Sequence, residues 1–311
     1  MKILVVGAGA VGGYFGGRLA QAGQDVTFLV RPGRAAQLQK AGLVIKSPLG
    51  DATLHDVKTV LAEQLQQQFD LIILSCKAYD LASAIASFAP AVGPQTLIMP
   101  LLNGMQHMDV LQQQFGAAHV LGGQCLIAAT LDREQQIVHL NNLAAISFGT
   151  PLGGIPDSVQ AVVEAMRGAQ FEASASDDIL QLMWEKWVFL ATLAGSTCLF
   201  RASIGDILSA PDGAALITAL WEECQAIAAH NGHPPRPAVL ERTRQMLFAE
   251  GSPLTASMLR DVENQARTEV DPILGDLLAR APESDKPTSS VLNIAFNHLK
   301  AYEARRVRAA A

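Results

Sequence analysis

Apolar and polar positions follow two different patterns along this chain. In the first half, short apolar runs rich in β-branched residues alternate with amphipathic segments, which is typical of buried parallel strands joined by helices. We predict strands at 3–6, 25–30, 70–75 and 96–99, and helices at 10–22, 35–41 and 81–88. Extended segments are also expected at 43–46 and 52–60, and strands at 120–131, 136–140 and 144–148 are expected to complete the sheet.

From Ile155 onward, the apolar positions recur with the period of a helix. We predict helices near 157–167, 177–200, 213–231, 238–249, 254–278 and 289–308. The two patterns predict an α/β domain over residues 1–153, followed by an all-α domain over residues 154–311. At 311 residues the chain is long enough for two domains of this size.

The first predicted strand leads into a glycine-rich turn, Gly7-Ala8-Gly9-Ala10-Val11-Gly12. In such a turn Gly7 allows a sharp bend, Gly9 lets a pyrophosphate approach the backbone, and Gly12 lets the helix pack closely on the strand. The helix start offers N–H groups and a positive dipole end to the phosphates. Alternatives are glycines that only pack a tight turn, and a signal peptide, which Arg18 would interrupt. The spacing favours a Rossmann-type dinucleotide-binding domain, with these six residues at the cofactor.

The second predicted strand ends in Arg31-Pro-Gly-Arg34, without an acidic residue at its carboxyl end. An acid at this position holds the ribose 2′-hydroxyl in NAD enzymes, whereas a guanidinium suits a 2′-phosphate. The alternative is that both arginines are solvated in a turn. We predict NADP as the cofactor, with Arg31 at its 2′-phosphate.

Composition narrows the possible functions. Half of the residues are hydrophobic and only 17% are charged, so the chain can bury a large core. Its formal net charge of −6 argues against nucleic acid as a main partner. The four cysteines are widely spaced and form no C-x-x-C motif, which argues against a zinc site or a disulfide framework and fits a cytoplasmic protein. We expect no metal site and no membrane segment.

Two polar residues follow predicted strands, at the sheet edge where ligands bind in open α/β folds. Lys77 is suited to contact a phosphate, a ribose or a substrate, and Asn103 both donates and accepts hydrogen bonds. A solvated lysine and an ordinary Asn-Gly turn explain these residues equally well.

Two charged residues are candidates in the predicted helical domain. Lys186 lies among Leu182, Phe189 and Leu190 in an apolar helix, where it either extends to water or is held as a proton donor. Glu269 is also expected on a helix, where a solvated charged face is the simpler explanation.

Several separate motifs occur together in one order: Gly-Ala-Gly-Ala-Val-Gly at 7–12, Ser-Cys-Lys-Ala-Tyr at 75–79, Asn-Gly-Met at 103–105, Trp-Glu-Lys at 184–186, Ser-Met-Leu at 257–259 and Arg-Thr-Glu-Val-Asp at 267–271. Through them the chain resembles the ketopantoate reductase (2-dehydropantoate 2-reductase) family over nearly its whole length. The resemblance implies NADPH-dependent reduction of ketopantoate to pantoate in pantothenate and coenzyme A biosynthesis. It implies an active site between the two domains, and places Arg31 at the 2′-phosphate.

The resemblance also implies roles for single residues. Lys186 matches the lysine that protonates the substrate oxygen. Glu269 matches a glutamate near the reacting carbon that holds substrate or cofactor and supports this lysine. Ser257 matches a serine that hydrogen-bonds the substrate, while Asn103 and Lys77 match residues that line the cofactor–substrate cleft.

Three positions depart from the family pattern, one of them an asparagine replaced around Ile204–Gly205. Leu190 and Ala194 stand where family members carry asparagines that bind the polar groups of ketopantoate. We consider Ser196, Thr197 and Arg201 as replacements, on their proximity in sequence.

Three other functions remain open beside the one that the resemblance implies. They are a reductase of another, less polar 2-oxo acid, a non-catalytic NADP-binding module, and a dehydrogenase of another superfamily. Lys186 and Glu269 speak against a binding module, because such a module needs neither residue. A homodimer is compatible with any of these functions.

Overall fold

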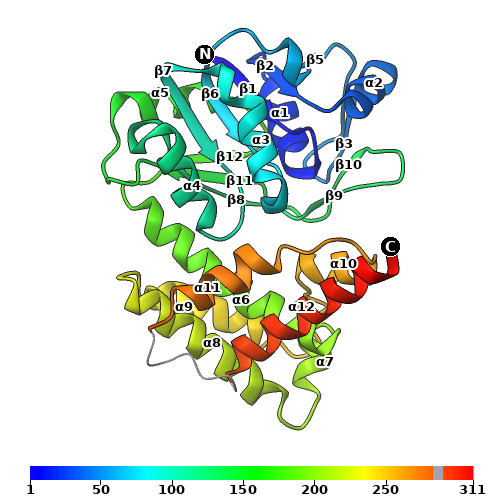
Figure 1. The fold of residues 1–311 in the computed structure, drawn as a ribbon, viewed down its shortest axis with the longest axis vertical. Coiled ribbons are helices and arrows are strands. Elements are labelled where there is room, and N and C mark those ends of the chain that lie inside the picture. Colours follow the sequence, from blue (N-terminus) through cyan, green and yellow to red (C-terminus); the bar gives the residue numbers. More distant parts are fainter. Residues whose placement is uncertain (283–289, 311) are drawn as a thin grey trace. The chain divides into compact units, whose positions relative to one another are not determined.

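A five-stranded parallel sheet forms the N-terminal part of the computed structural model, which describes residues 1–282 and 290–310 (Figure 1). Its strands lie in the order β5 (Lys58–Val60), β2 (Asp25–Leu29), β1 (Lys2–Val6), β6 (Phe69–Leu74) and β7 (Val92–Pro100). Val5 of β1 pairs with Phe28 on one side and Ile73 on the other, and all three side chains are fully buried. Because the strands are parallel, their carboxyl ends meet at one edge of the sheet.

Helix α1 (Ala10–Gln21) packs between this sheet and a second sheet. The second sheet has the order β4 (Ala52–Leu54), β3 (Leu43–Lys46), β10 (Ile137–His139) and β9 (Ala129–Leu131). A Cβ at Gly16 would collide with Phe28 of the first sheet, and one at Gly17 would collide with Leu43 of the second. The missing side chains let α1 approach both sheets, which offsets the low helix propensity of glycine.

A third sheet has the order β12 (Glu172–Ala175), β11 (Ala145–Gly149) and β8 (Gly122–Leu126). The expectation that the strands after residue 120 complete the first sheet is therefore wrong, because they pair within the second and third sheets. The sequence pattern did not predict β12, since Glu-Ala-Ser-Ala has no β-branched or aromatic residue. Its pairing with β11 extends the first unit to Ile179, beyond the boundary expected at 153/154.

The remaining helices of the N-terminal half agree with the prediction within a few residues, apart from one. They are α2 (Pro32–Ala41), α3 (Leu81–Phe88), α4 (Gln106–Phe115) and α5 (Asp157–Met166). The prediction missed α4, whose Gln-rich sequence contains few apolar residues. Short 3₁₀ turns lie at Ala62–Gln64, Ala78–Asp80, Ala89–Ala91 and Ala117–His119.

The second unit comprises residues 103–106 and the described residues from Leu180 onward. Its helices are α6 (Ile179–Phe200), α7 (Ile204–Leu208), α8 (Gly213–His230), α9 (Pro237–Leu247), α10 (Ser257–Glu263), α11 (Asp276–Ala279) and α12 (Val291–Ala310). Glu223 of α8 accepts the backbone N–H groups of Val291 and Leu292 at 2.9 and 3.0 Å, and so caps α12. The helix predicted at 289–308 corresponds to α12, although its expected first residue, Ser289, lies outside the described residues.

The helix predicted over 254–278 is wrong. In its place the chain forms α10, a loop, a π-helical turn (Asp271–Gly275) and α11. Helix α10 ends next to Gln265, whose φ of 56° is left-handed, and Pro272 cannot donate a backbone hydrogen bond. Glu269 therefore lies in the loop before the π-helical turn and not on a helix.

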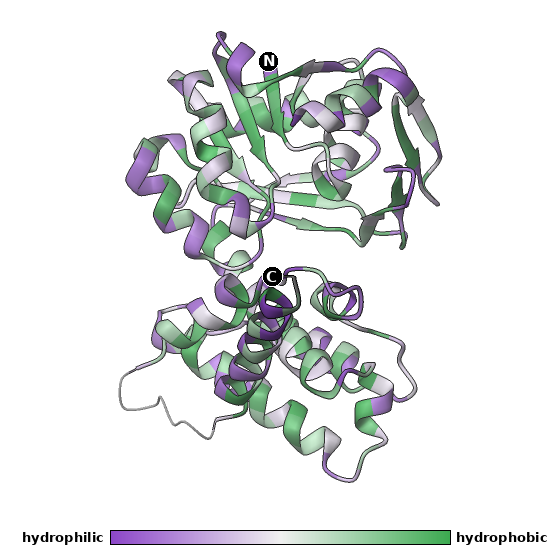
Figure 2. Cartoon of the chain, turned by 45° about the vertical axis from the view of Figure 1, so that its right-hand side comes forward, coloured by the Kyte–Doolittle hydropathy of each residue, from purple (hydrophilic) through white to green (hydrophobic). Residues whose placement is uncertain are grey.

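Figure 2 shows hydrophobic residues concentrated along the strands of the five-stranded sheet and on the helices of the second unit. No helix in the described part of the chain combines the length and the apolar character that a membrane crossing requires. The four cysteines form no disulfide among the described residues.

Candidate dinucleotide site and candidate catalytic residues

The glycine turn joins β1 to α1 in the geometry that the sequence predicts. Gly7 has a φ of 93°, a conformation that favours glycine, and its N–H donates to the Leu29 carbonyl at 3.0 Å. A Cβ at Gly12 would collide with Ser75 Oγ and with the Gly7 carbonyl, whereas a Cβ at Gly9 would meet no atom within 4 Å. Gly12 thus serves close packing of α1, and Gly9 borders open space.

The start of α1 is suited to bind an anion. Gly9 is its N-cap residue, no side chain caps the helix, and the first turn carries no acidic residue. The N–H groups of Ala10 and Val11 have no acceptor within the helix, because the first turn lacks preceding carbonyls. These donors and the positive end of the helix dipole fit the pyrophosphate of a dinucleotide.

Ser75 holds the glycine turn from the neighbouring strand, a role that the sequence pattern did not reveal. Its hydroxyl lies 3.1 Å from the Val6 carbonyl and 3.3 Å from the Gly7 carbonyl, and donates to this pair. Lys77 follows two residues later, at the carboxyl end of β6, and its side chain is exposed. The structure thus places Lys77 at the same sheet edge as the glycine turn.

The two arginines after β2 have different surroundings. The side chain of Arg31 is 77% exposed and forms an ion pair with Asp80 at 3.2 Å. Asp80 ends the short turn after β6, so the partner of Arg31 comes from a segment distant in sequence. Arg31 is thus accessible to a phosphate that competes with Asp80.

Arg34 is half-buried and bound to the protein. Its Nε donates to the Ala8 carbonyl at 3.0 Å, and its Nη1 donates to Gln37 Oε1 at 2.6 Å and to the Gln135 carbonyl at 2.8 Å. Burial lowers the pKa of Arg34 from its ordinary value, although a guanidinium stays charged at neutral pH.

In the second unit, Lys186 lies on a partly exposed apolar face of α6. Its helical neighbours Leu182, Phe189 and Leu190 are all half-buried, as is Lys186 itself. Of the two positions on this helix where the resemblance implies asparagines, Leu190 is therefore half-buried and Ala194 is buried.

The π-helical turn brings together segments that carry three of the candidates. Trp187 Nε1 donates to the Ile273 carbonyl at 2.9 Å, and a Cβ at Gly104 would collide with the Pro272 carbonyl. Lys186 adjoins Trp187, Asn103 adjoins Gly104, and Glu269 lies two residues before Asp271. Glu269 is 9% exposed. Turns of this kind are frequent at functional sites in proteins.

Glu303 of α12 fixes the loop that carries Glu269. Its Oε1 accepts the N–H and the hydroxyl of Thr268 at 2.6 and 2.8 Å, and its Oε2 accepts from Arg306 Nε at 3.0 Å. Burial alone would raise the pKa of Glu303, but these hydrogen bonds outweigh it and hold the pKa below its ordinary value.

Ser257, the first residue of α10, lies near a part of α6 that is distant from Lys186. It is exposed, and the N–H of the preceding Ala256 donates to Thr197 Oγ1 at 3.3 Å. Thr197 lies 11 residues after Lys186, which corresponds to about 16 Å along a helix axis. The structure thus places Ser257 beside the C-terminal half of α6.

The proposed replacements for the family asparagines differ in their surroundings. Thr197 Oγ1 is engaged with Leu193 and Ala256, and Arg201 pairs with Glu263 at 2.8 Å. Ser196 Oγ is buried and has no hydrogen-bond partner among the described residues. Among these three residues, Ser196 is therefore the one whose side chain forms no hydrogen bond or ion pair within the described residues.

Glu185 anchors the helix that carries Lys186. It is 4% exposed, and it accepts the N–H, Nε and Nη2 of Arg236 at 2.9, 2.8 and 2.6 Å. Burial would raise its pKa, but the hydrogen bonds from Arg236 and Gln181 hold the pKa of Glu185 below its ordinary value. The Glu of the Trp-Glu-Lys motif thus has a structural role that the sequence did not reveal.

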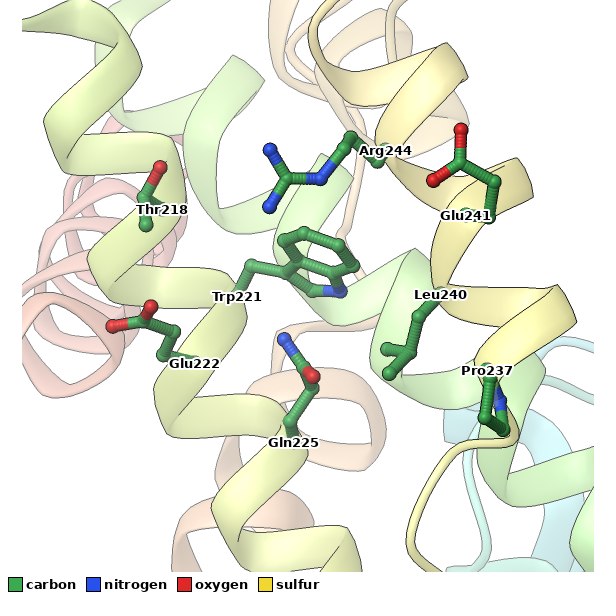
Figure 3. Close-up of a pocket in the computed structure, with 8 residues that line it drawn as sticks. All are labelled: Thr218, Trp221, Glu222, Gln225, Pro237, Leu240, Glu241 and Arg244. Atoms are coloured by element: carbon green, nitrogen blue, oxygen red, sulfur yellow. The ribbon is translucent and has the colours of Figure 1, made fainter.

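A pocket of about 330 Å³ between α8 and α9 contains none of the predicted residues (Figure 3). The Trp221 ring forms part of its wall, and the Arg244 guanidinium lies 5.8 Å from the centre of that ring. Within the described residues, no group of three or more His, Cys, Asp or Glu side chains is placed to hold a metal ion.

Two family models match this chain: "Ketopantoate reductase PanE/ApbA" over residues 3–153, and "Ketopantoate reductase PanE/ApbA C terminal" over residues 178–303. The chain is 37% identical to the "Uncharacterized oxidoreductase YkpB" of Bacillus subtilis (strain 168), over 98% of this chain and 100% of that protein.

Solved structures agree with these matches. The 2-dehydropantoate 2-reductase from Methylococcus capsulatus has a TM-score of 0.85 at 26% identity, covering 98% of each chain. A D-mandelate dehydrogenase, solved with NADH and anilino(oxo)acetate, has a TM-score of 0.87 at 21% identity over 98% of this chain and 99% of that one. The similarity to D-mandelate dehydrogenase shows a shared fold.

Proposed function

The chain belongs to the ketopantoate reductase PanE/ApbA family of NAD(P)-dependent oxidoreductases, and from this premise we propose that it reduces ketopantoate (2-dehydropantoate) to pantoate with NADPH. The observation that carries the proposal is that the segments bearing Asn103 and Lys186 contact the π-helical turn that follows Glu269, through Gly104 and Trp187. In this role the protein would act in pantothenate and coenzyme A biosynthesis in the cytoplasm.

The cofactor would be held chiefly by the first unit. The N–H groups of the 7–12 turn would bind the pyrophosphate, and Arg31 would bind the 2′-phosphate after separating from Asp80. Lys77 and Asn103 would contact the cofactor as well. NADPH supplies the hydride when it is bound, while the protein supplies orientation and electrostatics.

Lys186 is the proposed proton donor. Negative charge grows on the substrate oxygen as its carbon is reduced, and a positioned ammonium group both stabilises that charge and supplies the proton. Glu269 would hold the substrate or cofactor and support Lys186, and Asn103 and Ser257 would hydrogen-bond the substrate. The Glu185–Arg236 pair would keep α6, and with it Lys186, in place.

A second candidate substrate is a less polar 2-oxo acid. The specific observation in its favour is the apolar face of α6 around Lys186, formed by Leu182, Phe189 and Leu190. A substrate with an alkyl substituent would lose less hydration there than hydroxylated ketopantoate.

Loss of NADPH absorbance with ketopantoate, 2-oxoisovalerate and 2-oxopantolactone tests the proposal. We expect the highest kcat/KM with ketopantoate. A higher kcat/KM with 2-oxoisovalerate would change the proposed substrate but not the proposed reaction. Tight NADPH binding without turnover of any of the three would contradict the proposed enzyme and favour a non-catalytic NADP-binding module.

A further inference from the structure

Arg31 and Arg34 lie three residues apart after β2, yet their guanidinium groups have different surroundings. Arg31 is 77% exposed, whereas Arg34 is half-buried and donates three hydrogen bonds to the protein. A guanidinium grips a phosphate with two parallel donors, taken either from Nε and Nη2 or from Nη1 and Nη2. In Arg34 both Nε and Nη1 are already used, so neither edge is free for such a grip.

The contact with Ala8 acts on the glycine turn itself. Ala8 lies between Gly7 and Gly9, the two residues of the turn with the greatest backbone freedom. All described peptide bonds are trans, so the Ala8 carbonyl and the Gly9 N–H point in opposite directions. By holding the Ala8 oxygen at 3.0 Å, Arg34 therefore fixes the direction of the Gly9 N–H, away from Arg34.

The same guanidinium reaches the second sheet. Gln135, whose carbonyl accepts from Arg34 Nη1 at 2.8 Å, lies in the turn between β9 and β10 and has a left-handed φ of 63°. Asp132 Oδ1 stabilises this turn by accepting the N–H groups of Glu134 and Gln136, each at 2.9 Å. Arg34 thus connects a braced turn of the second sheet to the glycine turn of the first.

We propose that Arg34 is a positioning residue, which holds the Ala8–Gly9 peptide so that the N–H groups of the turn face the cofactor pyrophosphate, while Arg31 recognises the 2′-phosphate. The inference rests on the proposed dinucleotide site and deepens it. A turn with two glycines would otherwise lose conformational entropy when the cofactor binds. Because Arg34 orders the turn before binding, part of this entropic cost is removed.

Matched variants separate the two arginines. In Arg34→Met the stem remains and every donor is lost, and Arg31→Met makes the same change three residues away. The probes are NADPH, NADH and 2′-AMP, which carries a 2′-phosphate without a pyrophosphate, with Kd measured by calorimetry. We expect Arg34→Met to weaken NADPH and NADH by the same factor, roughly tenfold, and to leave 2′-AMP unchanged. Arg31→Met should weaken NADPH and 2′-AMP and leave NADH unchanged.

Two binding results would overturn the inference. One is an Arg34→Met protein that loses affinity for NADPH and 2′-AMP but keeps its affinity for NADH, because Arg34 would then be a 2′-phosphate ligand. The other is an Arg34→Lys protein with full wild-type affinity for NADH, because charge without the bridging geometry would then suffice.

A measurement without any ligand tests the positioning directly. Hydrogen–deuterium exchange of the amides of residues 8–11 should be faster in Arg34→Met than in the wild type or in Arg31→Met. Equal exchange in all three proteins would overturn the inference. A wild-type protein that binds neither dinucleotide would refute the proposed function, while this exchange result would still decide whether Arg34 orders the turn.

Discussion

The glycine turn and the surroundings of Lys186 are built in opposite ways. The turn is made of backbone from six consecutive residues, and the groups proposed to bind the cofactor are N–H donors, which any sequence with the same backbone geometry would supply. The Lys186 region combines three segments that are distant in sequence, and Trp187 and Gly104 connect two of them to the π-helical turn of the third. A local motif therefore identifies the first region, whereas the second depends on long-range packing.

The largest effect should come from the candidate proton donor. Lys186→Ala removes the only ammonium proposed to act on the substrate oxygen, so kcat should fall by about 10²-fold or more, the usual scale of acid–base catalysis. Steady-state kinetics with NADPH and the best 2-oxo acid measure this fall. Lys40→Ala, in the last turn of α2, serves as the control and should keep its kcat. Near-normal turnover of Lys186→Ala would remove this lysine from the mechanism.

Two glycine substitutions distinguish packing from binding within the turn. Gly12→Ala introduces a Cβ that collides with the Gly7 carbonyl, so the free energy of unfolding should fall by about 1–3 kcal/mol. Gly9→Ala meets open space, so stability should change by less than about 0.5 kcal/mol, while NADPH binding weakens because the Cβ enters the pyrophosphate space. Urea unfolding and calorimetry measure both quantities. A Gly9→Ala protein with wild-type Kd would contradict this division of roles.

The cofactor preference should depend on Arg31. Arg31→Ala should raise the KM for NADPH roughly tenfold and leave the KM for NADH almost unchanged, because one charge-assisted contact to the 2′-phosphate is lost. Asp80→Asn removes the carboxylate that pairs with Arg31 at 3.2 Å, and should lower the KM for NADPH. Equal changes for both cofactors in Arg31→Ala would refute the assignment.

The smallest effect concerns the loop that carries Glu269. Hydrogen bonds from Thr268 and Arg306 depress the pKa of Glu303, so its carboxylate adds stability above the unfolded pKa of about 4.3, and this stability is lost as pH falls through the lower folded pKa. Glu303→Gln should reduce stability by about 1 kcal/mol near pH 7, and the difference should shrink in acid. Urea unfolding at both pH values checks this, and a difference that grows in acid would show the opposite linkage.

Parts of the fold that depend on local sequence were predictable, whereas parts that depend on long-range contacts were not. The strand, turn and helix at the N-terminus were readable because burial and turn geometry are set within the first 21 residues. The sequence pattern could not show that the later strands form separate sheets, because register depends on partners far away in the chain. It could not show the break before Asp271 either, since the left-handed Gln265 and the Thr268–Glu303 contact override an otherwise helical pattern.

The candidate site was predictable only in part. Residue types and motifs pointed to Lys186, Glu269 and Asn103, but not to the turn around which their segments gather. Asp80, Ser75 and the binding of Arg34 to Ala8 were not foreseeable, because each depends on a contact between residues distant in sequence.

The burial of α1 between two sheets has a consequence for the ionic-strength dependence of binding. Protein on both sides of the helix lowers the dielectric constant around its half-buried first turn, so dissolved ions screen the field there less than they screen a fully exposed charge. Arg31, by contrast, is open to the surrounding electrolyte. Added salt should therefore weaken NADPH binding more steeply than NADH binding, and the preference for NADPH should narrow as salt concentration rises.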